Sequence, residues 1–343
     1  MNSLRILHLS DDRPGHYHLA DGVIAAISRR RAVDEQKVVI ARRWMIPGRT
    51  LRTLCASRAV SPAHLLRIGY GLDPATLQPA DLVISSGGET LPPNVAAARL
   101  LGTENIFIGS RRGVDSENFS LIVSSYDRHQ GQDRHLVTLK PSALDPDALG
   151  RPNRVPTFTP DRLPKICGLL VGGDSGLFKY TAQEWSELFD FARAVSRAWG
   201  TRWLVSTSRR TPPEIAEAAF ELAKDKDTVL DFVDYRFAGP GTLEKIFSRA
   251  DAILCSEDSS TMISESIWAR LPVVGVSPNR HSFKAEEADY RAMMLANDWC
   301  RFLPIAGLTP ERFGEALSQI KPLRENPLDT LAGDLKARLP ALF

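Results

Sequence analysis

The sequence predicts an α/β protein made of two Rossmann-like parallel-sheet domains that face each other across a cleft. Its 343 residues exceed one typical domain. Short apolar runs alternate with amphipathic helical patterns along the chain, as in βαβ units. The stretch from Asp251 to Val276 is the clearest example, because an apolar run, a polar turn, a helical pattern to Arg270 and a second apolar run follow in order.

Changes in composition place the domain boundaries. Residues 141–164 are rich in Pro, Asp, Asn and Arg and have little periodicity, so we expect the linker there. We therefore predict an N-terminal domain over 1–150 and a C-terminal domain over 165–325. The last segment, 326–343, has a helical pattern and is expected to cross back to the N-terminal domain.

Composition and charge exclude several classes of protein. A formal net charge of +2 argues against a nucleic-acid partner bound through bulk positive charge. The four cysteines are far apart with no CxxC pair, so no metal site is expected. The charged residues that interrupt the first apolar run argue against a signal peptide, and no window of 18 apolar residues occurs. We expect a cytoplasmic protein.

The first predicted strand, residues 4–9, ends in the polar loop Ser-Asp-Asp-Arg-Pro-Gly-His. Pro14 and Gly15 are expected to delay the next helix until about His18 and to let a ligand approach the backbone. The loop has no G-x-G-x-x-G pattern, which argues against a dinucleotide cofactor. His16 is the first candidate for a general base and Asp12 the second, because a histidine titrates near neutral pH. The alternative is that both are turn residues capping the helix.

The rest of this half continues the same pattern. Apolar runs at 81–86, 105–109, 120–124 and 136–139 are predicted strands. The first of them ends in a pair of glycines before a helix that runs to about Leu101. A cleft between two such domains can hold a donor substrate in one half and an acceptor substrate in the other. Because ligands bind at the carboxyl ends of parallel strands, we expect these loops to form the acceptor side. The acceptor-side residues are Asp11, Arg13, Gly15, Gly87 and Gly88.

The segment 42–70 is basic and amphipathic, and it contains no Asp or Glu. Such a surface suits anionic lipid headgroups, which would give a peripheral contact with the inner face of a membrane. The alternative is a helical excursion packed on its own domain. We favour the alternative, because arginine side chains readily cover apolar surface.

The C-terminal half begins with a predicted strand at 166–171, which ends in a glycine-rich turn, followed by a long helix at 180–199. A second strand at 202–206 ends in hydroxyl and arginine residues before a helix from about Pro213. Short neutral donors, permanent charge and a helix start are what a diphosphate needs. A solvated basic turn is the alternative. The residues concerned are Gly172, Gly173, Ser175, Ser208, Arg209, Arg210 and Thr211.

The turn inside 251–276 completes this site. Asp258, Ser259 and Ser260 precede a helix start, where free N–H groups and the helix dipole attract anions. Glu265 lies one turn further on the same helix face, and its carboxylate would accept hydrogen bonds from two ribose hydroxyls. Ordinary helix capping is the alternative for all four residues.

Five motifs in order resemble a known family. They are DDRPGH, ISSGG, LLVGGDSGLFKYT, STSRRTP and SEDSSTMISES, and they span nearly the whole chain. Together they resemble the mitochondrial-fission ELM-type family, whose bacterial members are described as glycosyltransferases, and the general arrangement is similar to glycosyltransferases of the GT-B fold. The chain departs from the family at Arg13, where members usually have Lys, and near His18, where they usually have Gln.

The resemblance implies an activity. It implies transfer of a sugar from a nucleoside diphosphate sugar to a hydroxyl acceptor, such as a lipid-linked or cell-envelope glycan, without a cofactor or an essential metal. Two alternatives stay open: a non-catalytic interaction protein that keeps the fold, and a sugar-nucleotide epimerase.

Overall fold

The computed structural model describes residues 3–57, 60–150, 157–159, 161–239 and 241–343. They form two compact units, Met1–Ala143 with Pro327–Phe343, and Leu144–Asn326. We call these the N-terminal and the C-terminal unit. Residues 144–150 belong to the C-terminal unit and not, as expected, to the N-terminal domain. The reason is local bonding, because the indole of Trp268 donates to the carbonyl of Leu144 and Arg270 pairs with Asp147.

The N-terminal unit contains a six-stranded parallel sheet in the order β2-β1-β3-β4-β5-β6. The chain moves from β1 outward to β2 and then starts again on the other side with β3, so the sheet reverses direction between β1 and β3. Its strands are β1 (Leu4–Ser10), β2 (Val33–Val39), β3 (Leu82–Ser86), β4 (Glu104–Ile108), β5 (Leu121–Ser124) and β6 (His135–Val137).

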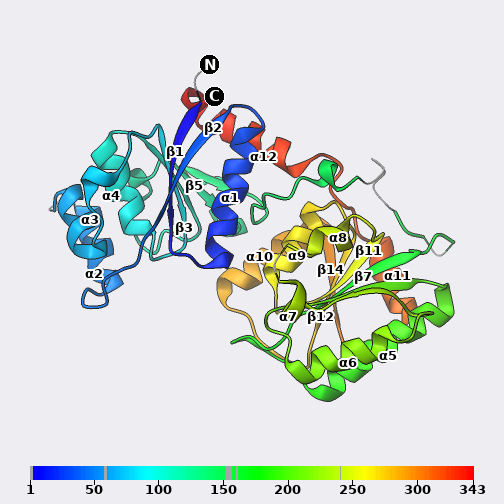
Figure 1. Ribbon diagram of the computed structural model, residues 1–343. Coiled ribbons are helices and arrows are strands. Elements are labelled where there is room, and N and C mark those ends of the chain that lie inside the picture. The colour runs from blue at the N-terminus through cyan, green and yellow to red at the C-terminus, as the bar shows by residue number, and fades with distance from the viewer. Residues whose placement is uncertain (1–2, 58–59, 151–156, 160, 240) are drawn as a thin grey trace. The chain divides into compact units, whose positions relative to one another are not determined.

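Helix α12 lies beside α1 in this unit, although the two are at opposite ends of the chain (Figure 1). Helix α1 begins at Pro14, four residues earlier than expected. Proline suits the first position of a helix, because its φ is already helical and its missing N–H would have no partner there. The helices are α1 (Pro14–Ser28), α2 (Gly48–Ser57), α3 (Pro62–Tyr70), α4 (Leu91–Leu101) and α12 (Pro327–Arg338).

The C-terminal unit contains a second six-stranded parallel sheet, in the order β10-β9-β7-β11-β12-β14. Strand β14 was not predicted, because its partly exposed residues do not form a continuous apolar run. The two-residue strands β8 (Phe178–Lys179) and β13 (Arg280–His281), which pair antiparallel, were also missed. The strands of the large sheet are β7 (Ile166–Val171), β9 (Arg202–Thr207), β10 (Val229–Val233), β11 (Ala252–Ser256), β12 (Val273–Ser277) and β14 (Cys300–Pro304).

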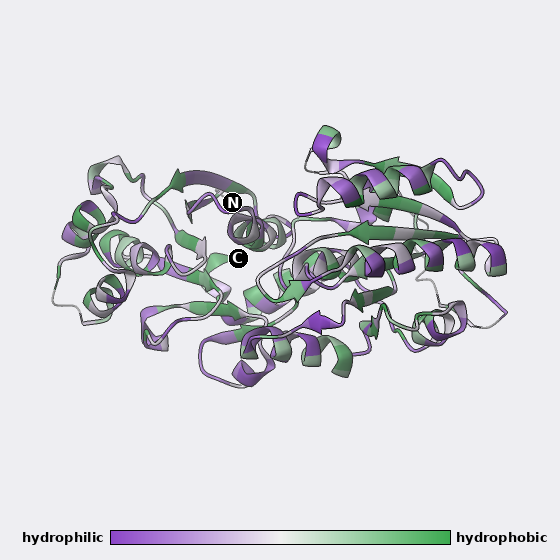
Figure 2. Ribbon diagram, turned by 90° about the horizontal axis from the view of Figure 1, so that it is seen from below, coloured by the Kyte–Doolittle hydropathy of each residue, from purple (hydrophilic) through white to green (hydrophobic). Residues whose placement is uncertain are grey.

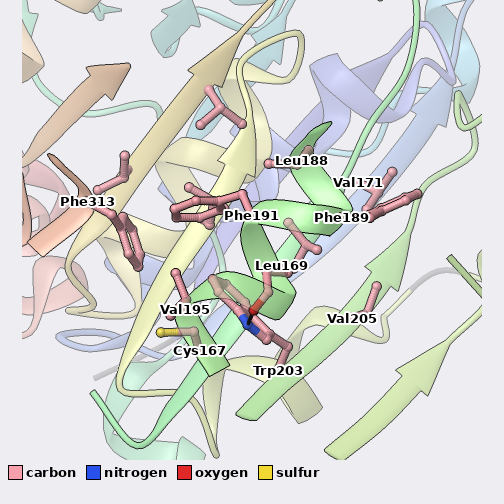
Figure 3. Close-up of a cluster of buried hydrophobic side chains, with 14 of the residues drawn as sticks. Cys167, Leu169, Val171, Leu188, Phe189, Phe191, Val195, Trp203, Val205 and Phe313 are labelled. Carbon is pink, nitrogen blue, oxygen red and sulfur yellow. Dashed lines mark hydrogen bonds between the residues drawn. The ribbon is translucent and has the colours of Figure 1, made fainter. Parts of the chain in front are cut away.

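An aromatic core lies between this sheet and its helices (Figure 3). Trp203 of β9 is fully buried, and its indole N–H donates to the carbonyl of Ala192 at 2.9 Å. Phe313 meets Phe191 edge to face at 5.6 Å between ring centroids. The helices of this unit are α5 (Ala182–Trp199), α6 (Pro213–Ala223), α7 (Tyr235–Ala238), α8 (Leu243–Phe247), α9 (Ser260–Trp268), α10 (Ala285–Ala296) and α11 (Pro310–Ser318).

Hydropathy follows the layers of each unit. In Figure 2 the central strands are largely green, whereas the long helices carry both purple and green residues. This is the pattern of sheets buried on both faces and helices with one solvated side. None of the helices in the described part of the chain is long and apolar enough to cross a membrane.

Candidate functional site

The C-terminal sheet brings two predicted turns together at the point where its strand order reverses. Strand β7 lies between β9 and β11, so the loops after β7 and β11 leave the same edge side by side. The backbone N–H of Gly172 donates to the hydroxyl of Ser256 at 2.7 Å, which fixes one loop against the other. Open α/β sheets bind ligands at this position.

The two glycines after β7 leave no space for side chains. A Cβ at Gly172 would lie 2.1 Å from Asp258 Oδ1, and one at Gly173 would lie 1.9 Å from the carbonyl oxygen of Arg210. Because these approaches are possible only without a Cβ, the loop after β7 lies directly against the Asp258 side chain of the loop after β11 and against the backbone of Arg210 in the turn after β9. The structure therefore brings Gly172, Gly173, Arg210 and Asp258 together at one edge of the sheet.

Arg210 and Asp258 form an ion pair across this edge. The guanidinium Nη2 and Nε lie 2.7 and 3.0 Å from Asp258 Oδ2. The Asp258 side chain is fully buried, while Arg210 stays 37% exposed. Burial raises the pKa of the Asp258 carboxyl above its ordinary value, and the charge of Arg210 opposes that rise. Arg210 is therefore held in place by a buried acid.

The hydroxyls of the turn after β9 have structural partners. Thr211 Oγ1 donates to the carbonyl of Val171 at 2.8 Å and accepts from the N–H of Ser208 at the same distance. Ser208 Oγ accepts from the N–H of Arg210 at 3.2 Å. These bonds close the turn and tie it to β7. Arg209 is exposed, and within the described chain no carboxylate pairs with it.

Helix α9 begins directly after the loop that follows β11. Ser259 is the N-cap, and its side chain accepts from the N–H of Met262. Ser260 is the first helical residue, and Glu265 is half-buried in the second turn of the same helix. Ser175 lies further along the loop after β7, where its N–H donates to the carbonyl of Phe178 at 3.1 Å.

A buried ion pair that the sequence did not reveal supports the end of β11. Arg291 Nε lies 2.6 Å from Glu257 Oε1, and its Nη2 donates to the Glu257 carbonyl at 2.8 Å. The guanidinium also lies 4.3 Å from the ring centroid of Phe283. Glu257 and Arg291 are 34 residues apart, on β11's loop and α10. No local pattern connects them, so only the fold could identify the pair.

The N-terminal sheet has an equivalent point, between β1 and β3. His16 Nδ1 lies 2.7 Å from Asp11 Oδ2, and the Asp11 side chain is only 6% exposed. A Cβ at Gly87 would lie 2.3 Å from His16 Nδ1, and the φ of +94° at Gly87 also favours glycine. The imidazole is therefore fixed between a carboxylate and the backbone of the loop after β3.

The other predicted acceptor-side residues take different positions. Asp12 is exposed with a left-handed φ of +58°, and its N–H donates to Ser10 Oγ at 3.1 Å, so it is Asp11 that bonds His16. Arg13 Nε lies 3.9 Å from Asp11 Oδ2. Gly15 is exposed, with no atom within 4 Å of a Cβ built there. A Cβ at Gly88 would meet the guanidinium of Arg112, a residue that the sequence did not single out.

One cluster has metal-ligand chemistry within the part of the chain that the structure describes. His8 Nδ1 lies 2.8 Å from Glu35 Oε1 and 3.8 Å from Asp21 Oδ1. Lys37 Nζ lies 3.9 Å from the same Asp21 oxygen. The ammonium thus already supplies a positive charge to the Asp21 carboxylate.

Several solved structures have the same fold. The UDP-GlcNAc 2-epimerase of Methanocaldococcus jannaschii superposes with a TM-score of 0.58 at 11% identity, covering 99% of this chain and 100% of that one. The S. aureus MnaA–UDP structure gives 0.56 at 10% identity, with coverages of 99% and 98%. The glycotransferase of kitacinnamycin gives 0.50 at 14% identity, with coverages of 100% and 96%. At this identity the likeness establishes the two-sheet α/β fold of GT-B type.

Sequence comparison identifies the family directly. No curated protein sequence matches the chain. The five motifs described above nevertheless fall within or next to the region matched by a family model, residues 14–333, which covers most of the chain. On this evidence the chain belongs to the mitochondrial fission ELM1 family.

Proposed function

We propose that the protein is a glycosyltransferase that moves a sugar from a nucleoside diphosphate sugar to a hydroxyl acceptor. The observation that supports this most is the convergence of three turns at the switch point of the C-terminal sheet, with Arg210 fixed by Asp258 and the start of α9 beside it. Relatives in fold include a UDP complex and enzymes of sugar nucleotides and glycosyl transfer. A diphosphate suits this edge.

The donor would bind the C-terminal unit. Arg209 and Arg210 would contact the diphosphate together with the backbone N–H groups at the start of α9, beside Ser259 and Ser260. Protein groups would thereby supply the positive charge that stabilises the leaving diphosphate. Glu265 would accept hydrogen bonds from the ribose hydroxyls. Ser208 and Thr211 would act by holding the turn, because their hydroxyls already have partners.

The acceptor would bind the N-terminal unit. His16 Nε2 would take the proton of the attacking hydroxyl as the new glycosidic bond forms and the bond from the sugar to the diphosphate breaks. Asp11 would orient the imidazole through Nδ1 and stabilise it once it is protonated. Asp12, the second candidate for the base, makes no bond to His16, and it is Asp11 that contacts the imidazole.

Two variants test these roles separately. Calorimetry with UDP, GDP, ADP and CMP should show that Glu265→Ala weakens binding of the cognate nucleotide, whereas the exposed Glu244→Ala control and His16→Gln should not. Transfer to the acceptor should fall about 10²- to 10⁴-fold in His16→Gln, the usual contribution of a general base. Unchanged nucleotide affinity in Glu265→Ala would refute the ribose assignment.

A second candidate is a sugar-nucleotide epimerase, because an epimerase is among the structures most similar in fold. The two functions differ in their need for an acceptor. Incubation with a nucleotide sugar alone, followed by NMR of the sugar, should leave the substrate unchanged for a transferase. Conversion without any acceptor would favour the epimerase. Failure to bind any of the nucleotides would favour a non-catalytic role.

We also propose that the segment after β2 contacts an anionic membrane surface, where a lipid-linked acceptor would be found. Helices α2 and α3 pack into their own unit, as favoured from the sequence, and bury Leu51 and Leu66. The loop between β2 and α2 does not pack into the unit in this way, since Trp44 is 86% and Met45 is 72% exposed. Arg43 and Arg49 flank it, and no described carboxylate pairs with them; Arg58 lies outside the described residues. Trp with Arg suits a lipid interface.

Vesicle sedimentation tests this contact. Binding should require phosphatidylglycerol in phosphatidylcholine vesicles, and Trp44→Ala should weaken it about tenfold, since burial of a large apolar side chain contributes roughly 1.5–3 kcal/mol. Phe237→Ala is the matched control, because Phe237 is also 86% exposed but lies in the C-terminal unit. Equal binding to neutral vesicles, or equal losses in the two variants, would contradict the proposal.

A further inference from the structure

Arg112 lies close to His16, the candidate base. The two side chains contact neighbouring glycines, His16 at Gly87 and Arg112 at Gly88. A Cβ at Gly88 would lie 2.4 Å from Arg112 Cζ and 2.6 Å from its Nε. A Cβ at Gly87 would lie 2.3 Å from His16 Nδ1. Since consecutive Cα atoms are 3.8 Å apart, the guanidinium and the imidazole lie within roughly 10 Å of each other. The imidazole of His16 lies against Gly87 and the guanidinium of Arg112 lies against Gly88.

The position of the turn after β4 places Arg112 next to Gly87 and Gly88. The turn follows β4, which pairs with β3 in the register Ser86 to Ile108, so it leaves the sheet next to the glycine pair. Arg112 has a φ of +47°, in the left-handed region that side chains other than glycine rarely adopt. Such a conformation persists where the surrounding structure imposes it, and it is common at binding sites.

The neighbouring acids do not neutralise Arg112. Asp11 bonds His16 at 2.7 Å, and Glu89 Oε2 accepts from Arg42 Nε, also at 2.7 Å. Within the described chain, no carboxylate forms an ion pair with Arg112. The adjacent Arg111 differs, because its Nη1 donates to the carbonyl of Val114 at 3.0 Å and so holds the turn. Arg112 is therefore an exposed positive charge that lies against Gly88 and has no carboxylate partner among the described residues.

We propose that Arg112 binds an oxyanion, a phosphate or a carboxylate, on the acceptor. The acceptor would then carry a negative group close to the hydroxyl that faces His16. A planar guanidinium suits both groups, since its two N–H donors match two oxygens. This inference rests on the proposed function for its acceptor, and it narrows the acceptor from any hydroxyl compound to an acidic one.

The test uses His16 as a local reporter, because a phosphate could also bind the C-terminal unit. The chain has seven histidines, and the Hε1 NMR signal of His16 is the one that disappears in His16→Gln. In the full-length protein, glucose 1-phosphate or glucuronate should shift this signal saturably, and glucose should not. The probe that binds more tightly identifies the oxyanion as phosphate or carboxylate.

Two variants remove the subsite in different ways. Arg112→Gln removes the charge, and Gly88→Ala displaces the guanidinium while keeping the charge, because the three atoms nearest to a Cβ there all belong to this flexible side chain. Both should weaken the anion titration at least tenfold, and Arg112→Lys should restore part of the phosphate response. Arg30→Gln, which removes one exposed charge elsewhere in this unit, is the control and should titrate like the wild type.

Three results would overturn the proposal: a signal unmoved by either anion, an equal shift with glucose, or an unchanged titration in Arg112→Gln. Nucleotide calorimetry reports on the C-terminal unit and is independent of this readout. Normal nucleotide binding with no anion response at His16 would leave the transferase standing without an acidic acceptor. An anion response without nucleotide binding would leave the subsite standing without the transferase.

Discussion

At the edge of the C-terminal sheet where we propose that the donor binds, contacts with single atoms determine which glycines can be replaced. At Gly172 a Cβ would collide with the buried carboxylate of Asp258 and with Ser256 Oγ, whereas at Gly176, in the same loop, a Cβ meets nothing within 4 Å. The sequence shows both only as glycines in one glycine-rich turn. The structure separates a glycine required by packing from one that is only part of a loop.

This difference gives a paired prediction. Gly172→Ala should destabilise the protein by about 1–3 kcal/mol, the usual cost of overpacking, and lower the Tm by roughly 3–10 °C. Gly176→Ala should leave the Tm nearly unchanged. Differential scanning calorimetry measures both. Equal Tm values for Gly172→Ala and wild type would mean that the three turns do not pack as closely as described.

Burial also makes Asp258 unusual in its response to pH. Its pKa is raised above 3.8 by burial, so the unfolded chain loses this proton at lower pH than the folded one. Folding stability from this group is therefore greatest below pH 3.8 and falls as the pH rises through the folded pKa. In urea unfolding, the stability of wild type minus that of Asp258→Asn should decrease as the pH rises.

Asp81 is the control of opposite sign. The guanidinium of Arg5 hydrogen-bonds its carboxylate and lowers its pKa below 3.8. Its contribution to stability is therefore present above pH 3.8 and lost as the pH falls through the folded pKa. The stability of wild type minus that of Asp81→Asn should decrease on acidification. The same direction for both variants would contradict the burial assigned to Asp258.

At the scale of elements, α12 shows how the end of the chain completes the N-terminal unit. Leu331 and Leu335 are buried, and Arg29 of the segment after α1 pairs with Asp329 at 2.8 Å. The sequence predicted a helix at 326–343, because its apolar residues recur at helical spacing. Its place beside α1 depends on contacts across some 300 residues, which no local pattern specifies.

The packing of α12 leads to a prediction for this unit alone. Leu335→Ala should cost about 2–5 kcal/mol, as for other buried leucines, and hydrogen exchange should accelerate in α1. Exchange in α5, which belongs to the C-terminal unit, should be unaffected. The exposed Lys336→Ala is the control and should change neither helix. Faster exchange in α5 but not in α1 would contradict the assignment of α12.

At the scale of the whole molecule, two six-stranded parallel sheets each reverse their strand order once. In the N-terminal unit the reversal brings Asp11 and His16 to the glycine pair after β3. In the C-terminal unit it brings the loop after β7 to the turn after β11. The candidate residues thus gather at the two positions where doubly wound sheets bind ligands, and the proposed division into acceptor and donor units follows from this.

The sequence by itself determined the parallel α/β class, most strands and helices, and which loops carry polar and glycine residues. These are local properties, because hydrophobic periodicity and turn chemistry act over a few residues. Only the tertiary structure decided which side chains meet: Asp11 with His16, Arg210 with Asp258, Glu257 with Arg291 and Arg112 with Gly88. These partners are brought together by sheet order and loop geometry, so a one-dimensional pattern contains no record of them.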